Sequence, residues 1–270
     1  MIDQSLVERI ALALERIAPP AAAPVVEGAS AYVWNGQLHV IANFRPLPID
    51  RLTGIDAQRD AVLANGRRLA SGHAAHDILL WGARGSGKSA IVKSSVATLQ
   101  SEGAALSLIE VPANLIADLP QIFTLIANWA SAVIVFVDDL AFSHLDQTAR
   151  LLRSVLEGGA SARPSHVRLY VTSNCRHIVS RDMAEQDSAI NPRDVIDDSL
   201  ALADRFGLSL GFHACDQQTY LAMVANYARA LGLEFSEQDA LTWATQRGAR
   251  SGRIAWHYAN ELAGRAGKPI

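Results

Sequence analysis

Residues 82–89 of this chain are Gly82-Ala83-Arg84-Gly85-Ser86-Gly87-Lys88-Ser89, and they match the pattern G-x-x-x-x-G-K-[ST] at every fixed position. The apolar run 78–81 before them predicts a buried strand, and the run 90–99 after them predicts a helix. A glycine-rich turn in that context directs backbone N–H groups and the positive end of the helix towards phosphate groups. The segment therefore predicts a phosphate-binding loop in an α/β fold.

The side chains of this loop indicate how it would bind a nucleoside triphosphate. Lys88 would reach the β- and γ-phosphates, and the hydroxyl of Ser89 would hold Mg²⁺. Gly82, Gly85 and Gly87 allow the backbone to wrap closely around the anion. The alternative is a glycine-rich turn that binds nothing, and the complete pattern between a strand and a helix favours the phosphate site.

The composition limits the class of protein. The chain has 270 residues, of which 50% are apolar, so it is long enough for one large core with a smaller satellite domain. Its formal net charge of −3 provides no global basic field for nucleic acid. Cys175 and Cys215 are far apart and indicate neither a disulfide framework nor a metal site. No apolar run has the length of a membrane span and the N-terminus lacks a signal-peptide core, so we expect a cytoplasmic protein without a membrane partner.

The pattern of the chain changes twice, which predicts three parts. Residues 1–48 combine a helix, a Pro/Ala linker and a hairpin with Asn35-Gly36 as its two-residue turn. Residues 49–213 alternate strands with helices, which predicts a parallel five-stranded sheet with helices on both faces and a charged loop at 180–198. Residues 214–270 have no strand pattern and predict a small helical domain. The expected strands of the sheet are 78–81, 106–111, 132–137, 167–172 and 207–212.

Two carboxylates follow the most apolar of these strands. Asp138 and Asp139 come directly after residues 132–137. An acid at that place beside a phosphate loop can hold Mg²⁺ through water, and a second acid can polarise an attacking water. The alternative is an acid pair that faces solvent or caps the next segment. The upstream phosphate loop favours Asp138 with Ser89 as the metal site and Asp139 as the group that activates water.

The fourth expected strand ends in a polar triplet, Thr172-Ser173-Asn174. If the sheet places the strand of the phosphate loop between the fourth and fifth strands, Asn174 lies between that loop and Asp138. Its amide could then orient the water or contact the γ-phosphate. The alternative is a turn-forming asparagine. Together with the other motifs, the position favours a functional amide.

Taken together, these motifs resemble those of an AAA+ ATPase over residues ~50–265. In that resemblance, Gly82–Ser89 is Walker A, Ile134–Asp139 is Walker B, Asn174 is sensor 1 and residues 214–270 are the lid. More narrowly, the chain resembles a bacterial AAA+ branch known only as a domain of unknown function. The narrower resemblance lies in residues 52–58, 155–159, 172–177 and 204–207. It implies ATP and Mg²⁺ as ligands, and a homo-oligomer, either a ring or a transient assembly, with ATP at the seam between subunits.

The resemblance also implies residues that contact the nucleotide. Arg205 corresponds to the finger that contacts the γ-phosphate of a neighbouring subunit, with an Asp204–Arg205 surface pair as the alternative. Arg253 corresponds to the arginine that the lid adds in cis, and Arg250 is the second candidate. Ile55 lies in a segment similar to the one that lines adenine.

Two features depart from the common AAA+ pattern. Asp139 stands where most members have glutamate and is one methylene shorter, so the water must sit closer or hydrolysis must be slower. Slow turnover would suit a nucleotide-controlled switch. Residues 112–119 lack the aromatic residue that unfoldases use to grip polypeptide, which counts against a threading unfoldase.

The function expected from the sequence is an ATPase that remodels, loads or regulates a macromolecular partner. The alternatives are a small-molecule kinase with a phosphate loop and a nucleotide-binding switch with little hydrolysis. Residues 1–48 either bind a protein partner or pack against the core. A nucleic-acid partner is unproven and would need an arginine cluster, for which a solvated surface is the preferred interpretation. The candidate arginines are Arg150, Arg153, Arg163 and Arg168.

Overall fold

The computed structural model describes residues 27–140, 147–157, 163–174 and 203–269. Outside these residues lie the expected N-terminal helix, the Pro/Ala linker, Cys175 and the charged loop at 180–198.

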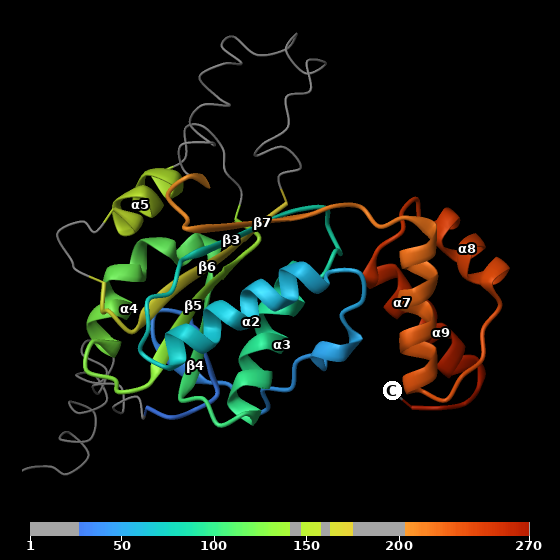
Figure 1. The fold of residues 1–270 in the computed structure, drawn as a ribbon, viewed down its shortest axis with the longest axis horizontal. Helices are drawn as coiled ribbons and strands as arrows, with labels where there is room; N and C mark the ends of the chain where they lie inside the picture. The colour runs from blue at the N-terminus through green and yellow to red at the C-terminus, as the bar shows by residue number, and fades with distance from the viewer. Residues whose placement is uncertain (1–26, 141–146, 158–162, 175–202, 270) are drawn as a thin grey trace, which may run out of the picture.

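A seven-stranded sheet in the order β2-β1-β4-β5-β6-β3-β7 forms the centre of the structure (Figure 1). The five expected strands are all present, but the sheet is wider than predicted because the N-terminal hairpin joins it. Ala31 of that hairpin pairs in parallel with Leu108, so β1 extends the sheet beyond β4. The strands are β1 Ala31–Trp34, β2 Leu38–Val40, β3 Ile78–Gly82, β4 Leu106–Pro112, β5 Ala132–Asp138, β6 Val167–Ser173 and β7 Leu208–Phe212.

The hairpin also differs from the prediction in its turn. Trp34 pairs with Leu38 across the antiparallel ladder, which leaves residues 35–37 as the loop. The loop therefore has one residue more than the expected Asn35-Gly36 turn. Gly36 still supplies the positive φ of +94° that the turn requires.

Helices cover both faces of the sheet (Figure 1). Within β5, Val133, Val135 and Val137 belong to one apolar cluster with residues of α4 and α5, whereas Ile134 and Phe136 belong to a second cluster with residues of α2 and α3. The alternation of side chains along a strand explains this division, and burial on both faces explains why β5 is almost wholly apolar. The elements are η1 Ile49–Arg51, α2 Asp56–Ala70, α3 Lys88–Ser101, η2 Ala113–Asp118, α4 Leu119–Ile126 and α5 Gln147–Leu156.

Three helices follow the last strand and lie to one side of the sheet (Figure 1). They bury an apolar cluster of their own, which includes Tyr220, Val224 and Tyr258. A hydrogen bond links these three helices to the rest of the protein: Arg51 Nη1 in η1 donates to Asn226 Oδ1 in α7 at 3.0 Å. The assignment of residues 214–270 as a separate domain stays a prediction. The helices are α7 Gln217–Ala230, α8 Glu237–Gln246 and α9 Gly252–Arg265.

A polar side chain caps each of these three helices. Asp216, Ser236 and Ser251 each accept a hydrogen bond from a backbone N–H in the first turn of the helix that follows. Such caps satisfy one of the N–H groups that a helix start leaves without an intrahelical partner. The start of α9 is therefore well defined, which matters because it lies at the phosphate loop.

The strand order brings the expected motifs together. β3 lies between β6 and β7, as the interpretation of Asn174 required, and β5 lies on the other side of β6. Because these strands are parallel, their carboxyl ends meet at one edge of the sheet. Open α/β sheets bind ligands at such an edge.

Candidate functional site

The loop of residues 82–87 joins β3 to α3 and depends on its glycines. At Gly82, φ is +128°, and a Cβ atom there would lie 2.0 Å from the carbonyl oxygen of Phe212 in β7. At Gly87, directly before the first residue of α3, φ is +97°. These positions favour glycine because residues with a Cβ rarely adopt such angles. The expected strand–loop–helix arrangement is therefore present.

Lys88 begins α3 and turns its ammonium group into the loop. Its Nζ donates to the carbonyl oxygens of Gly82 at 2.9 Å and Ala83 at 2.8 Å, and to Asn174 Oδ1 at 2.9 Å. The residue is only 6% exposed, and burial lowers the pKa of Lys88, although Asp138 and Asp139 act in the opposite direction. All three ammonium protons thus have acceptors in the protein.

The predicted metal pair, Ser89 and Asp138, is in direct contact. The hydroxyl of Ser89 donates to Asp138 Oδ1 at 2.6 Å, which joins the start of α3 to the end of β5. Both groups offer oxygen atoms, which are the ligands that Mg²⁺ prefers. The pair lies beside the phosphate loop, where Mg²⁺ would meet phosphate oxygens, so the residues present fit this ion.

Asp139 and Asn174 also contact each other. The Nδ2 atom of Asn174 donates to Asp139 Oδ1, while Oδ1 of the same amide accepts from Lys88. Asn174 therefore bridges the phosphate-loop lysine and the second acid, as its position between the strands led us to expect. Asp139 itself has a φ of +54°, the one positive value among the described non-glycine residues.

Thr172 is a residue of the site that the sequence reasoning missed. Its Oγ1 donates to Asp138 Oδ1 at 2.5 Å and accepts from the backbone N–H of Asp139 at 2.8 Å. The only sequence signal was a hydroxyl at the end of β6, two residues before Asn174. Because β6 lies beside β5, a hydroxyl at the end of β6 can reach the acids at the end of β5.

The start of α9 lies against the phosphate loop. The backbone N–H of Arg253 donates to the carbonyl oxygen of Gly85 at 3.3 Å. A Cβ atom at Gly85 would lie 2.9 Å from Ser251 Oγ and 3.2 Å from Arg253 Cβ. Arg253 also lines the cavity over the loop, whereas Arg250, the second candidate from sequence, is not among the residues that line it.

Arg205 does not line this cavity. Its Nε donates to Glu157 Oε1 at 2.7 Å, so it makes an ion pair with the residue just after α5. The structure therefore brings together the lysine, serine, acids, amide and lid arginine of the predicted site, and leaves the predicted finger apart from them.

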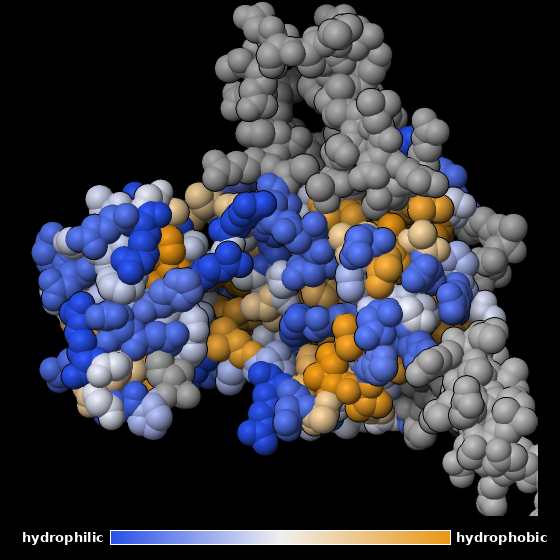
Figure 2. All heavy atoms as spheres, turned by 180° about the vertical axis from the view of Figure 1, so that it is seen from behind, coloured by the Kyte–Doolittle hydropathy of each residue, from blue (hydrophilic) through white to orange (hydrophobic). Residues whose placement is uncertain are grey.

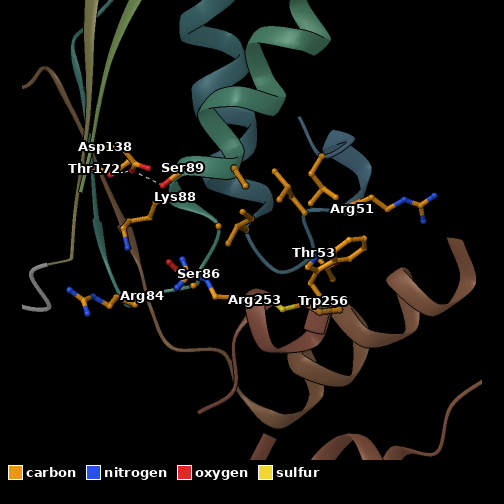
Figure 3. A pocket seen from close by; sticks show the side chains of 18 of the residues that line it. Arg51, Thr53, Arg84, Ser86, Lys88, Ser89, Asp138, Thr172, Arg253 and Trp256 are labelled. Carbon is orange, nitrogen blue, oxygen red and sulfur yellow. Dashed lines mark hydrogen bonds between the residues drawn. The ribbon is translucent and has the colours of Figure 1, made fainter. Parts of the chain in front are cut away.

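The cavity has two chemically different ends and a volume of about 620 Å³, within the range of small-molecule sites. Lys88, Ser89 and Asp138 lie at one end, and Trp256 lies towards the other (Figure 3). The rings of Trp256 and Tyr227 pack in an edge-to-face arrangement, with ring centroids 5.3 Å apart. Arg51 and Thr53 lie on the same side as Trp256 (Figure 3). The apolar side chains that line the cavity are Leu47, Leu52, Ile55, Met223, Tyr227 and Trp256.

Two of the arginines that were candidates for binding nucleic acid, Arg163 and Arg168, make hydrogen bonds within the protein. Arg163 Nη1 donates to both carboxylate oxygens of Asp77 at 2.7 Å, and Arg168 Nε donates to the carbonyl oxygen of Ala75 at 2.6 Å. Burial lowers the pKa of Arg168. The side chain of Arg150 lies outside the described part. These contacts favour a structural role for Arg163 and Arg168.

The visible surface and the acidic, histidine and cysteine side chains are the other places where a candidate site could lie. The face in Figure 2 mixes hydrophilic and hydrophobic side chains over both the sheet and the three C-terminal helices. In the described part of the chain, no group of three or more His, Cys, Asp or Glu side chains is arranged to hold a metal. None of the helices in residues 27–140, 147–157, 163–174 and 203–269 has the length and hydropathy to cross a membrane.

One family model and several solved structures are similar to this chain. The model of a family described as "Protein of unknown function (DUF815)" matches residues 27–266. A search of curated proteins finds no match. Several solved structures are similar, at identities too low to show more than the fold.

Three of these structures represent the group. The Holliday junction branch migration motor RuvB of Thermotoga maritima is 15% identical with a TM-score of 0.51, over 83% of this chain and 68% of that one. The ORC1 protein of Aeropyrum pernix, solved in complex with DNA, is 16% identical with a TM-score of 0.55, over 84% and 63%. Domain III of the Thermotoga maritima replication initiation protein DnaA is 12% identical with a TM-score of 0.52, over 84% and 94%.

Proposed function

Because this chain belongs to the family described as protein of unknown function (DUF815) and has an AAA+ type P-loop fold, we propose that it is an ATPase that hydrolyses ATP to ADP and phosphate with Mg²⁺. One observation carries the proposal. Lys88, the Ser89–Asp138 pair and the Asn174–Asp139 pair meet around one glycine-rich loop. Each group is of the type that its part of phosphoryl transfer requires.

ATP would lie along the cavity with its phosphates on the loop. The backbone of residues 82–89 would bind the phosphates, and Lys88 would exchange its carbonyl acceptors for phosphate oxygens, which are charged and so accept more strongly. The adenine would lie at the end of the cavity near Trp256, against apolar lining residues such as Ile55 and Tyr227. A flat aromatic base suits that end because it needs apolar and aromatic contacts.

The side chains around the γ-phosphate would then carry the reaction. Ser89 and Asp138 would hold Mg²⁺, which when bound neutralises charge on the phosphates. Asp139 would accept the proton of the attacking water, and Asn174 would orient that water. Arg253 would balance charge that develops on the transferred phosphoryl group.

Arg205 completes the proposal in a homo-oligomer. It lies outside the cavity of its own chain, so it would act on ATP bound by a neighbouring subunit. An arginine supplied in this way is worth about 10³–10⁵ in kcat. Its ion pair with Glu157 would hold it in place until a neighbour docks.

The partner that the ATPase would remodel, load or regulate is macromolecular in this proposal. RuvB is described as a Holliday junction branch migration motor, and ORC1 was solved in complex with DNA. We do not extend DNA binding to this chain, because Arg163 and Arg168 already bind acceptors within it. A second candidate function is a nucleotide-controlled switch with little hydrolysis, which the shorter Asp139 favours.

The test is phosphate release from ATP over a range of protein concentrations. We expect specific activity to rise with concentration, to vanish in Lys88→Ala, and to fall in Arg205→Ala while ATP binding persists. Arg265→Ala is the matched control, because Arg265 also pairs with one glutamate, Glu261, but lies away from the cavity. ATP binding without phosphate release at any concentration would refute hydrolysis and leave the switch.

A further inference from the structure

Thr172 holds the end of β5 through three hydrogen bonds to three consecutive residues. Its Oγ1 donates to Asp138 Oδ1 and accepts from the N–H of Asp139, and its carbonyl oxygen accepts from the N–H of Leu140 at 2.8 Å. The residue is only 1% exposed, so water does not compete for these contacts.

The first of these bonds fixes the carboxylate of Asp138. Its Oδ1 accepts from Thr172 at 2.5 Å, from Ser89 at 2.6 Å and from the N–H of Asp139 at 3.1 Å. Three donors on one oxygen set the plane of the carboxylate. Among the described residues they all reach Oδ1, which leaves Oδ2 as the oxygen that can face a cation or its water.

The second and third bonds fix the turn at Asp139. A φ of +54° is unfavourable for a residue with a Cβ, so the surroundings must hold it. Thr172 does so on both sides of the turn, through the N–H of Asp139 and the N–H of Leu140. With the chain turned in this way, the short side chain of Asp139 reaches the amide of Asn174.

We infer that Thr172 is a positioning residue that orients Asp138 towards Mg²⁺ and aims Asp139 at the attacking water. The inference rests on the proposed ATPase function and deepens it. Thr172 lines the cavity, but both hydrogen bonds of its hydroxyl go to Asp138 and Asp139, so it would act through these two acids. Groups that orient metal ligands in this way typically contribute about 10- to 100-fold in metal affinity or activity.

Thr172→Val removes the hydroxyl and keeps the shape of the side chain, and Thr172→Ser restores the hydroxyl. The test compares these two variants with wild type. Binding of a fluorescent ATP analogue is measured in EDTA and over a Mg²⁺ titration, beside phosphate release. For Thr172→Val we expect affinity in EDTA within about twofold of wild type, a Mg²⁺ midpoint raised about 10-fold and kcat lowered about 10- to 100-fold. Thr172→Ser should restore both the Mg²⁺ midpoint and kcat towards their wild-type values. Thr98→Val is the control, because its hydroxyl bonds Ser94 of its own helix.

The outcomes separate this inference from the proposed function. If Lys88→Ala binds the analogue as wild type does, the proposed nucleotide site is wrong. If Lys88→Ala loses binding while Thr172→Val keeps the wild-type Mg²⁺ midpoint and kcat, the positioning role alone is wrong. A lowered melting temperature with an unchanged Mg²⁺ midpoint would show Thr172 to be merely structural. Should the valine variant fail to fold, Thr172→Ala is measured against the same criteria.

Discussion

Replacement of Gly85 by alanine tests whether the contact between the phosphate loop and α9 controls ATP binding. Gly85 has a φ of +74°, and an added Cβ would lie 2.9 Å from Ser251 Oγ and 3.2 Å from Arg253 Cβ. Gly72 provides a matched control, because its φ is +72° and an added Cβ meets nothing within 4 Å. The two variants therefore share the backbone penalty, and only Gly85→Ala disturbs the start of α9.

The magnitudes follow from this difference. A left-handed backbone costs a residue with a Cβ about 1–2 kcal/mol, so both variants should lose about that much free energy of unfolding. In Gly85→Ala the start of α9 must also move away, which breaks the hydrogen bond from Arg253 N to Gly85 O and shifts the Arg253 side chain. The displaced Arg253 side chain would lose its proposed hydrogen bond to an ATP phosphate, and a hydrogen bond to a charged group is worth about 1.5–3 kcal/mol. ATP affinity should fall about 10- to 150-fold in Gly85→Ala alone.

The assay pairs urea unfolding with titration of a fluorescent ATP analogue for the two variants. We expect Gly85→Ala to lose about 0.5–1.5 kcal/mol more stability than Gly72→Ala, because it also loses the hydrogen bond from Arg253 N, and we expect a loss of ATP affinity in Gly85→Ala alone. Equal ATP affinity in Gly85→Ala and Gly72→Ala would refute the reasoning, since α9 would then tolerate displacement without effect on the nucleotide.

Three further predictions concern the cavity. Asp139→Asn should bind ATP as wild type does and lower kcat by about 10²- to 10⁴-fold, measured by phosphate release, because asparagine tolerates the left-handed turn but accepts no proton. Trp256→Ala should weaken ATP binding by about 1–3 kcal/mol, because ATP carries a base that can stack on the ring. Inorganic tripolyphosphate has no base, so calorimetry should show its binding unchanged. Equal losses of binding for both ligands would exclude a base at Trp256. Burial lowers the pKa of Lys88 below its ordinary 10.5, so the charged form is disfavoured on folding. The resulting cost in stability is complete below the lowered pKa, shrinks as pH rises above it, and is gone above 10.5. ATP affinity should therefore decline with pH before 10.5 is reached, and Lys88→Arg, which stays charged, should show no such decline relative to its own value at neutral pH.

Local patterns predicted most of the fold. The glycine-rich loop, the apolar β5 and the helix starts at Ser236 and Ser251 are encoded by neighbours in sequence, and the structure confirms these elements. The width of the sheet was not predictable in this way. β1 pairs with β4, and Ala31 lies far along the chain from its partner Leu108, so no short window of sequence contains the signal.

The order of residues along the chain is enough to predict which chemical groups are present: a phosphate loop, two acids after a buried strand and an amide after the next. These follow from residue type and from periodicity, which are local properties. Which of these groups contact one another depends on the three-dimensional fold. It placed Thr172 on Asp138 and the start of α9 on Gly85, because parallel strands bring their carboxyl ends to one edge and because α9 packs back over that edge. Such contacts depend on strand order and on packing between distant segments, and neither is written in any single stretch of the chain.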